Sequence, residues 1–505
     1  MLFNSYQFIF LYLPVTLAAF ALLGRFSHRA SIIWLALASL VFYGHWNLHD
    51  VPVLCGSILF NFMLSGMISR AESEPLGKRL LAFALVANLG ALGYYKYSGF
   101  AATELAAIGL DTSSFAAPTL PLGISFFTFT QIAFLVDCFQ RKAAERNFPS
   151  YFLFVTYFPH LIAGPVLHHK EMMPQFNAKR SSFLDAGGLA IGVTMFAIGL
   201  FKKVVLADSV AGYANQGFGA AASGVSLTPI EAWSAALSYT FQLYFDFSGY
   251  SDMAIGLSRM FGIRLPLNFD SPYKATSIID FWRRWHMTLS RFLRDYLYIP
   301  LGGNRKGPAR RYINLLTTMV LGGLWHGAGW TFIVWGALHG VYLCINHAIA
   351  AVRDRIVLPS SFAPLERCLA WLTTFIAVVV AWVFFRADSF TTALSICFSM
   401  FSGTPSPAGL FNALAHPTQR FPGVTTNLGG LDLLRLLALF GIAILLPNSQ
   451  EWLDRFKPAL QIAAKVPLKS LQWRPHWALG VAMGVVAGVS VAMISSDSAF
   501  LYFNF

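Results

Sequence analysis

Residues 281–340 read FWRRWHMTLSRFLRDYLYIPLGGNRKGPARRYINLLTTMVLGGLWHGAGWTFIVWGALHG. This stretch places His286 and His326 among aromatic residues and glycines, in a chain that has only 12 histidines among its 505 residues. Its first part is rich in arginine, whereas residues 312–352 contain no Asp, Glu, Lys or Arg. The two parts therefore predict different structures.

Residues 281–296 form the basic part. At about 100° per residue, their aromatic and leucine side chains share one helical face, and His286 lies at the edge of that face. The opposite face carries four arginines, Arg283, Arg284, Arg291 and Arg294. Ser277 and Asp280 form an S-x-x-D start signal. A helix with one basic and one aromatic face lies in the membrane interface more readily than it crosses the membrane, so we predict an interfacial helix.

Residues 312–352 form the uncharged part, which is long enough for about two membrane spans at roughly 20 residues each. If the run leaves the interface near Arg311, His326 lies roughly 22 Å further along a helix. An imidazole and irregular backbone are tolerated at that depth where they face the protein interior or a water-filled cavity. We therefore predict a buried polar chamber with His326 in its wall, where the neighbouring glycines make room for a substrate.

The composition indicates a polytopic integral membrane protein. The chain is 56% hydrophobic and 12% charged, against about 25% charged in soluble domains, and its mean hydropathy is +0.58. We predict an all-α fold with roughly 11–12 transmembrane helices plus re-entrant and interfacial helices. The net charge is +13, and the Lys and Arg residues lie in short loops between apolar runs. This is the distribution that the positive-inside rule describes, so the basic charge does not indicate a nucleic-acid partner.

The apolar runs divide one predicted domain, 1–505, into N-terminal spans (1–140), a core (150–350) and C-terminal spans (369–505). Predicted spans cover 7–24, 31–48, 51–69, 79–98, 119–138, 186–204, 369–385, 431–446 and 476–494. Between them, 151–169 is interrupted by prolines and predicts a broken or re-entrant segment. Residues 208–230 lack Lys and Arg and predict an outer loop.

The charge of the loops predicts their sides of the membrane. Residues 70–79, 141–147 and 353–367 carry Lys and Arg, whereas 99–118 carries none. The basic loops are therefore expected in the cytoplasm, with 99–118 and both termini outside.

Other polar residues leave alternatives open. Asp246 and Asp252 lie in an apolar, helix-like context and are either functional carboxylates or structural groups that hold helices together. His160, His168 and His169 lack the helical spacing of metal ligands, so we predict no metal site.

Several motifs resemble the signature of the membrane-bound O-acyltransferase family. The two main ones are RRWHMTLSRFLRDYLYIPLGGNRKG (283–307) and GGLWHGAGWTFIVWGALHG (322–340). Three further motifs resemble one subgroup of this family, namely FPHLIAGPVLHHKEMMPQF (158–176), YFDFSGYSDMAIG (244–256) and FLYFNF (500–505). These point to bacterial members that acetylate polysaccharides, with alginate as the expected polymer and peptidoglycan or cellulose as alternatives.

The resemblance implies a mechanism and a location. The catalytic histidine of the family falls on His326 and a second polar position falls on His286. Members move an acyl group from a cytoplasmic thioester, such as acetyl-CoA, through a central polar tunnel to a hydroxyl outside. The implied setting is the bacterial inner membrane, with membrane lipids around the chain, a periplasmic serine-hydrolase-like acetyltransferase as partner and no bound cofactor.

The residue types agree with acyl transfer. Histidine is the usual base for activating a hydroxyl, so we assign that role to His326 and donor orientation or polarisation to His286. The oxyanion needs a donor, either the Trp325 indole or the glycine amides of 327–329. There is no G-x-S-x-G motif, so we expect no serine acyl-enzyme, whereas an acyl-histidine stays open.

Three interpretations remain alongside this one. The four arginines either hold donor phosphates or anchor the chain to anionic lipids. In the other functional class, His286 and His326 form the proton relay of a transporter, with His339 and His347 as packing residues in either case. The aromatic tail 500–505 is expected to dock a partner or to lie in the outer aromatic belt.

Overall fold

The computed structural model describes residues 1–145, 147–162, 164–178, 185–353, 359–402, 426, 428–461, 472–495 and 500–501. Every secondary-structure element in these residues is a helix, which confirms the all-α class. One hydrophobic core extends through them from Met1 to Phe500. The predicted division of the chain into three parts stays a prediction.

The N-terminal helices match the first five predicted spans. They are η1 (Phe8–Tyr12), α1 (Leu13–Phe26), α2 (His28–Gly44), α3 (Val51–Ser69), α4 (Glu74–Ala107) and α5 (Ile124–Phe139), with the short η2 (Leu48–Asp50) before α3. The hydroxyls of Ser27 and Ser73 accept backbone N–H groups at the starts of α2 and α4, as N-cap residues do. α4 is the longest of these helices. It begins before the predicted span 79–98 and continues beyond it to Ala107.

The segment predicted to be broken consists of α6 (Phe148–Thr156), α7 (Phe158–Leu161) and α8 (His169–Asn177). α6 ends where Tyr157 adopts a ψ of 105°. Pro159 then occupies the first turn of α7, where its missing N–H leaves no hydrogen bond unmade. The break is confirmed, whereas its re-entrance into a membrane stays a prediction.

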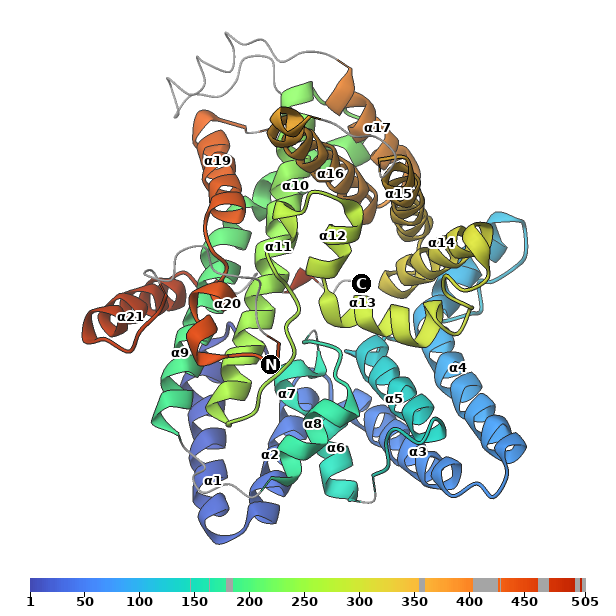
Figure 1. Cartoon of the computed structure of the whole chain (residues 1–505), viewed down its shortest axis with the longest axis vertical. Helices are drawn as coiled ribbons and strands as arrows, with labels where there is room; N and C mark the ends of the chain where they lie inside the picture. Colours follow the sequence, from blue (N-terminus) through green and yellow to red (C-terminus); the bar gives the residue numbers. More distant parts are fainter. Residues whose placement is uncertain are drawn as a thin grey trace.

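The centre of the molecule is α11 (Pro229–Met260), which packs along α9 (Ala186–Phe201) (Figure 1). A Cβ on Gly192 would lie 2.6 Å from the carbonyl oxygen of Gly256, and one on Gly199 would lie 2.5 Å from that of Gly249. Small residues on both helices therefore allow their backbones to touch, as in membrane helix pairs generally.

The predicted outer loop at 208–230 is wrong over most of its length. α9 continues through the π-helical turn η3 (Lys202–Ala207) into α10 (Asp208–Ala222). Lys202 and Lys203 lie in η3, and both form ion pairs with carboxylates of the protein. Because their charge is neutralised inside the protein, the helix does not stop there.

Those ion pairs agree with the structural interpretation of Asp246 and Asp252. Lys203 Nζ lies 2.8 Å from Asp246 and 2.7 Å from Asp208, and Lys202 Nζ lies 2.6 Å from Asp252. The hydroxyl of Ser449 also donates to Asp252 at 2.6 Å. Two consecutive lysines in a π-helical turn thus tie η3 to the middle of α11.

The predicted interfacial helix is not continuous. The structure has α12 (Ile278–Arg284), α13 (Met287–Leu293) and the π-helical turn η5 (Arg294–Tyr298). The start signal is confirmed, since the hydroxyl of Ser277 accepts the Asp280 N–H at 3.1 Å. The helix nevertheless breaks at Trp285 and His286, for a reason given below.

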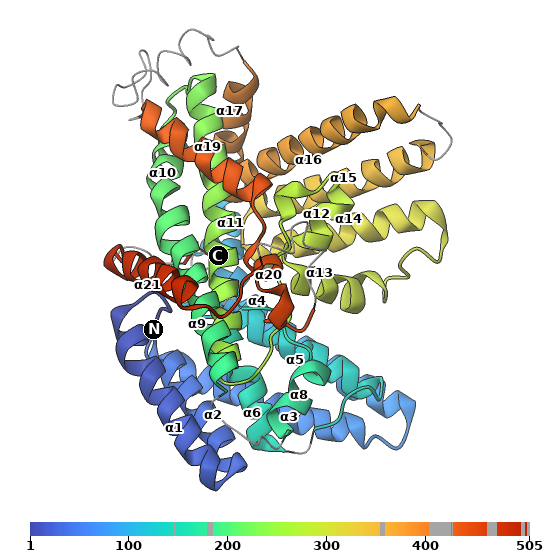
Figure 2. The same cartoon turned by 60° about the vertical axis from the view of Figure 1, so that its left-hand side comes forward.

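The C-terminal half holds α14 (Gly307–His326), α15 (Trp330–Arg353) and α16 (Ala363–Arg386), which lie side by side (Figure 2). The remaining helices are α17 (Phe390–Phe401), α19 (Gly430–Leu445), α20 (Ser449–Trp452) and α21 (Trp477–Ala492), with the short turns η4 (Pro272–Lys274), η6 (Ser360–Phe362) and η7 (Asp454–Phe456). The predicted spans at 369–385, 431–446 and 476–494 are confirmed as helices, and α17 was not predicted.

The described residues include six helical segments long and apolar enough to cross a membrane, over 8–26, 48–69, 74–107, 186–222, 330–353 and 360–386. This makes the protein a multi-pass membrane protein. The sequence predicted roughly 11–12 transmembrane helices, which is more than these six. The difference arises partly because the prediction also counted shorter apolar helices, such as α2 and α5, as spans.

The arrangement of helix ends agrees with the predicted alternation of loops. The Arg141 guanidinium donates to the carbonyl oxygens of Ser69 and Ala71, so the loops after α3 and α5 meet at one end of the molecule. The Trp330 indole donates to Glu104 at 3.0 Å near the far end of α4. Which end faces the cytoplasm stays a prediction.

The aromatic tail 500–505 was expected to dock a partner or to lie in the outer aromatic belt, and the structure describes only its first two residues. Phe500 is 2% exposed and packs on Tyr250 at 4.6 Å between ring centroids, and the Leu501 N–H donates to Asp246 at 3.1 Å. Phe500 therefore lies in the protein core and not in an aromatic belt. The rest of the tail lies outside the described residues.

We predict that Lys203→Met lowers the free energy of unfolding by about 3–5 kcal/mol, because it leaves a buried carboxylate unpaired. The double variant Lys203→Met/Asp246→Leu should recover most of that loss. Thermal unfolding in detergent measures both. The control is Lys78→Met, whose partner Glu74 is exposed in the same way as Lys78 and which should leave the unfolding temperature unchanged. Equal shifts for Lys203→Met and Lys78→Met would contradict the structural role.

Candidate functional site

His326 is the last residue of α14, where the chain turns back into α15. A Cβ on Gly323 would lie 2.2 Å from the Phe332 carbonyl oxygen, and one on Gly336 would lie 2.3 Å from that of Met319. These glycines therefore bring α14 and α15 into contact. The interpretation that glycines here make room for a substrate is wrong for Gly323, because the space beside it is filled by the neighbouring helix.

The His326 side chain is 4% exposed and lies among aromatic rings. Its ring centroid is 4.9 Å from that of Trp325, 5.0 Å from Trp335 and 5.2 Å from Phe385. It also lines a pocket of about 120 Å³ with Trp325, Lys96, Ser125 and Trp46. The sequence prediction of a buried chamber with His326 in its wall agrees with this geometry.

His286 is fully buried at a bend between α12 and α13. Its φ of 42° and ψ of 52° lie in the left-handed region, which costs a residue with a side chain about 1–3 kcal/mol. The extended segment before η4 holds the bend, since the Met287 N–H donates to the Asn268 carbonyl at 2.9 Å and the Asp270 N–H to that of Arg284 at 3.0 Å. These tertiary hydrogen bonds explain why an amphipathic sequence does not form one helix.

Asn268 also sets the tautomer of His286. Its Oδ1 accepts the backbone N–H of Thr288 at 3.4 Å and the Thr288 hydroxyl at 2.9 Å, so this atom is the amide oxygen. His286 Nδ1 lies 3.0 Å from the same oxygen and must therefore carry the proton. The Nε2 atom is then the hydrogen-bond acceptor of the neutral ring.

Trp325 lies between the two histidines. Its ring centroid is 6.4 Å from that of His286 and 4.9 Å from that of His326, and Phe129 stacks on it at 5.2 Å. In the part of the chain that the structure describes, Trp325 Nε1 has no hydrogen-bond partner. This indole is therefore a buried donor beside both histidines.

The other oxyanion candidates are less available. The Gly327 N–H donates to the Gly323 carbonyl at 3.4 Å, and the Gly329 N–H donates to that of Gly327 at 3.2 Å. Because both amides are engaged within the turn, Trp325 is the stronger candidate.

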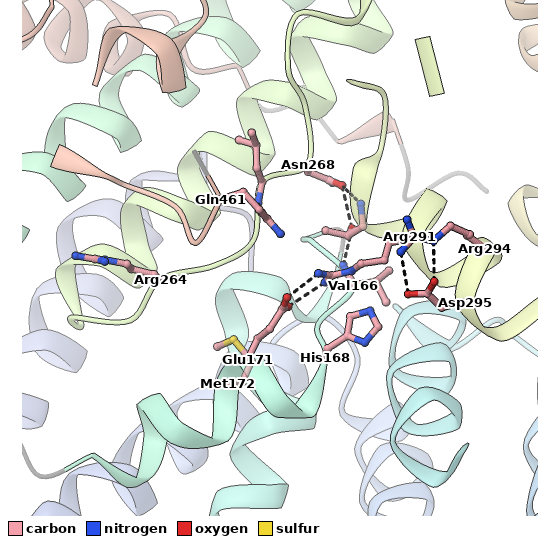
Figure 3. Close-up of polar contacts among 12 residues, drawn as sticks. Val166, His168, Glu171, Met172, Arg264, Asn268, Arg291, Arg294, Asp295 and Gln461 are labelled. Atoms are coloured by element: carbon pink, nitrogen blue, oxygen red, sulfur yellow. Dashed lines mark hydrogen bonds and ion pairs between the residues drawn. The ribbon is translucent and has the colours of Figure 1, made fainter. Parts of the chain in front are cut away.

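Three of the four candidate arginines converge on one pocket of about 580 Å³, namely Arg283, Arg291 and Arg294. Arg291 forms a bidentate ion pair with Glu171 at 2.6 and 2.9 Å, and Arg294 pairs with Asp295 at 2.7 Å (Figure 3). No ion pair of Arg283 is found among the described residues. We call this space the arginine pocket.

Arg284 does not belong to this group, so the prediction of one basic face of four arginines is corrected. Its guanidinium pairs with Asp280 at 2.9 Å and donates to the Asp270 carbonyl at 3.3 Å. The break at His286 reorients the residues before it relative to those after it. His347, expected to be a packing residue, lines the arginine pocket.

The two pockets meet α14 at different levels. The arginine pocket touches Leu315, Thr318 and Met319, whereas the smaller pocket touches Trp325 and His326. At 1.5 Å per residue, these contacts lie roughly 10–15 Å apart along the helix. Met287 and Thr288, directly after His286, line the arginine pocket, whereas Trp325, whose ring centroid lies 6.4 Å from that of His286, lines the smaller pocket.

The remaining histidines lie elsewhere. His339 packs in an aromatic cluster, where its Nδ1 accepts the Trp282 indole N–H at 3.3 Å, which agrees with a packing role. His160 Nε2 bonds the Phe154 carbonyl at 2.9 Å, and His168 Nδ1 lies 3.2 Å from the Tyr296 hydroxyl. Across the described ranges, no group of three His, Cys, Asp or Glu side chains lies close enough to hold a metal ion.

The sequence interpretation missed two contributors to the site. Asn268 has no distinguishing pattern around it, and its role depends on a contact across 18 residues. Lys96 did carry a signal, because it is a charged residue inside the predicted span 79–98, where ionisable side chains are functional candidates.

Comparison with known proteins gives a consistent match. A model of the membrane-bound O-acyltransferase family matches residues 123–387. A peptidoglycan O-acetyltransferase of Helicobacter pylori is 45% identical over 78% of this chain and 79% of its own. A probable alginate O-acetylase of Pseudomonas putida is 43% identical over 80% of each chain, and one of Pseudomonas fluorescens is 36% identical over the full length of both.

We predict that ¹⁵N spectra of histidine-labelled protein show Nδ1 of His286 as the protonated nitrogen. His160 provides the matched control with the opposite tautomer, because its Nε2 faces a carbonyl oxygen and must donate. In Asn268→Leu, the His286 resonances should move toward averaged tautomers while those of His160 stay unchanged. A His286 ring protonated at Nε2 in the native protein would contradict the assignment.

Proposed function

The chain belongs to the membrane-bound O-acyltransferase family and is an acyltransferase, and from this premise we propose that it moves an acetyl group across the bacterial inner membrane. The donor is a cytoplasmic acyl thioester, with acetyl-CoA as the first candidate, and the final acceptor is a hydroxyl of an extracytoplasmic polysaccharide. The observation that carries the proposal is the pair of pockets at different levels of α14. Trp325 lines the smaller pocket, and His286, whose ring lies 6.4 Å from that of Trp325, directly precedes two residues that line the larger one.

The arginine pocket suits the donor. Its volume of about 580 Å³ falls within the roughly 300–1,000 Å³ of small-molecule sites. Guanidinium groups bind phosphate oxygens through charge-assisted hydrogen bonds, and coenzyme A carries phosphates far from its thioester. Glu171 and Asp295 already neutralise Arg291 and Arg294, so Arg283 is the principal phosphate ligand in this proposal.

The smaller pocket suits the acceptor side. His326 accepts the proton of the acceptor hydroxyl while the hydroxyl oxygen attacks the thioester carbonyl. The Trp325 indole donates to the oxyanion of the tetrahedral intermediate. Collapse of that intermediate breaks the carbon–sulfur bond, the acetyl ester leaves with the acceptor, and the proton from His326 passes to the thiolate.

The tautomer of His286 narrows its proposed role. With Nδ1–H held by Asn268, the neutral ring offers Nε2 only as an acceptor. Polarisation of the thioester carbonyl requires a donor, so this ring does not supply it. We propose that His286 orients the donor by accepting an amide N–H of its pantetheine arm.

The size of the smaller pocket supports a relay to the polymer. At about 120 Å³, it is far below the roughly 300 Å³ at which small-molecule sites begin, and a polysaccharide chain does not fit. We therefore propose that a periplasmic serine-hydrolase-like acetyltransferase receives the acetyl group and completes delivery to the polymer.

We propose alginate as the polymer, with peptidoglycan as the alternative. Relatives named for both polymers have similar identities, at 43% and 45%. The relative from Pseudomonas fluorescens, named for alginate, aligns along the whole chain, whereas the peptidoglycan relative covers 78% of it. Assays with the two polymers in parallel, in membranes that also contain the partner, distinguish them.

We predict that Arg283→Gln raises the KM for acetyl-CoA about 10- to 100-fold, since a hydrogen bond to a charged group contributes about 1.5–3 kcal/mol. The neighbouring variant Arg284→Gln should leave this KM within about twofold, because Arg284 lies outside the pocket and so makes no bond to the donor. Initial rates at varied acetyl-CoA concentration measure both. Equal KM values for the two variants would favour a lipid anchor over a donor site.

We predict that His326→Ala lowers acetyl transfer to a soluble hydroxyl acceptor by about 10²–10⁴-fold, because the base is removed. His286→Asn should keep partial activity, because an amide still accepts a hydrogen bond. Purified protein in proteoliposomes with radiolabelled acetyl-CoA provides the measurement. A proton-relay transporter would instead lose pH-driven flux equally in both variants and would need no acyl donor. Full transfer by folded His326→Ala would end the catalytic assignment.

A further inference from the structure

Two consecutive residues of α4 reach the C-terminal end of α14. The Tyr97 hydroxyl donates to the Leu324 carbonyl at 2.6 Å. The Lys96 ammonium donates to the Trp325 carbonyl at 2.5 Å and to the His326 carbonyl at 3.1 Å. The last three carbonyls of the helix that ends at His326 are therefore bound by side chains from a helix more than 200 residues away in sequence.

These contacts replace an ordinary helix cap. The last carbonyls of an α-helix have no partner within the helix, and a left-handed glycine after the end commonly satisfies them. Gly327 follows α14, but its φ of −158° and ψ of 154° are extended. Because the chain must turn directly into α15, the carbonyls depend on donors from outside the hairpin.

The surroundings of Lys96 indicate an anchor. Its Nζ also lies 3.4 Å from the Ser125 hydroxyl and 5.8 Å from the centroid of the Trp325 ring. An ammonium group has three hydrogens to donate, and three oxygen atoms surround this one. A cation at a helix C-terminus is also stabilised by the helix dipole, so the group is committed to protein atoms, although it lines the same pocket as His326.

We propose that Lys96 and Tyr97 are positioning residues that fix His326 and Trp325 relative to the reacting groups. This inference rests on the proposed role of His326 as the base. The carbonyls that the pair binds belong to the peptide units that carry both side chains. Without them the end of α14 can shift, and a misplacement of about 1 Å costs on the order of 100-fold in rate. The arginine pocket touches α14 at Leu315–Met319, so donor binding should remain.

The test compares Lys96→Met, Lys96→Arg and Tyr97→Phe in the full-length protein, with acetyl-CoA as donor and a soluble hydroxyl acceptor. We expect Lys96→Met to lower kcat roughly 10- to 100-fold with KM for acetyl-CoA unchanged. Tyr97→Phe removes one oxygen and should lower kcat less. Lys96→Arg keeps a cationic donor and should restore part of the rate. Lys78→Met and Tyr94→Phe, on the same helix, provide matched controls.

The outcomes separate this inference from the proposed function. If Lys96→Met and Tyr97→Phe keep kcat within about twofold while His326→Ala is inactive, the positioning role is overturned and the proposed function stands. If His326→Ala is active, the proposed function itself fails. A rise in the KM for the acceptor without rescue by arginine would make Lys96 a substrate ligand and would also overturn the inference. Should Lys96→Met not fold, Tyr97→Phe decides by the same criterion.

Discussion

Both candidate catalytic histidines lie where a helix is interrupted inside the protein, and an interrupted helix leaves backbone groups that need hydrogen-bond partners. Such groups are costly where water cannot reach them. At His286 the partners come from the segment around Asn268. At His326 they come from Lys96 and Tyr97 on α4. The site is thus built at two helix ends whose hydrogen bonds are completed by distant parts of the chain.

This constraint explains why the site has a defined geometry in a protein made mostly of apolar helices. Dispersion and close packing hold α9 against α11 and α14 against α15 through facing glycines. Such contacts set the spacing of the helices but carry little directional information. The direction of the His286 ring is set by one amide oxygen, and that of the α14 end by one ammonium and one hydroxyl. Polar contacts of this kind specify a unique arrangement because few alternatives satisfy every group.

Much of the fold could be predicted from the sequence, since long apolar runs have few structures open to them in a membrane. The spans before residue 140 and the break between α6 and α8 follow directly from hydropathy and proline. Prediction failed where tertiary contacts change the meaning of a local pattern. An outer loop was expected at 208–230, but the helix continues through Lys202 and Lys203, whose charges Asp252 and Asp246 neutralise. The face of four arginines was lost because hydrogen bonds to the Asn268 segment break the helix.

The site was partly predictable for the same reason. His286, His326, Trp325 and three arginines were identified from their residue types and setting. The structure places the arginines in one pocket, Trp325 and His326 in the other, and His286 beside Trp325. Of their supporting residues, Asn268 has no distinguishing local pattern, and Lys96 could have been found as a charged residue inside a predicted span, but its partners at the end of α14 could not.

In the proposed reaction, the arginine pocket opens to the cytoplasm and the pocket of His326 opens to the outside. The most direct measurement labels single cysteines with a membrane-impermeant maleimide, in a chain whose five native cysteines are replaced by serine. Tyr298→Cys reports on the arginine pocket and Leu120→Cys on the pocket of His326. We expect labelling of Tyr298→Cys only in inverted vesicles and of Leu120→Cys only in right-side-out vesicles. Labelling of both positions from the same side would contradict it.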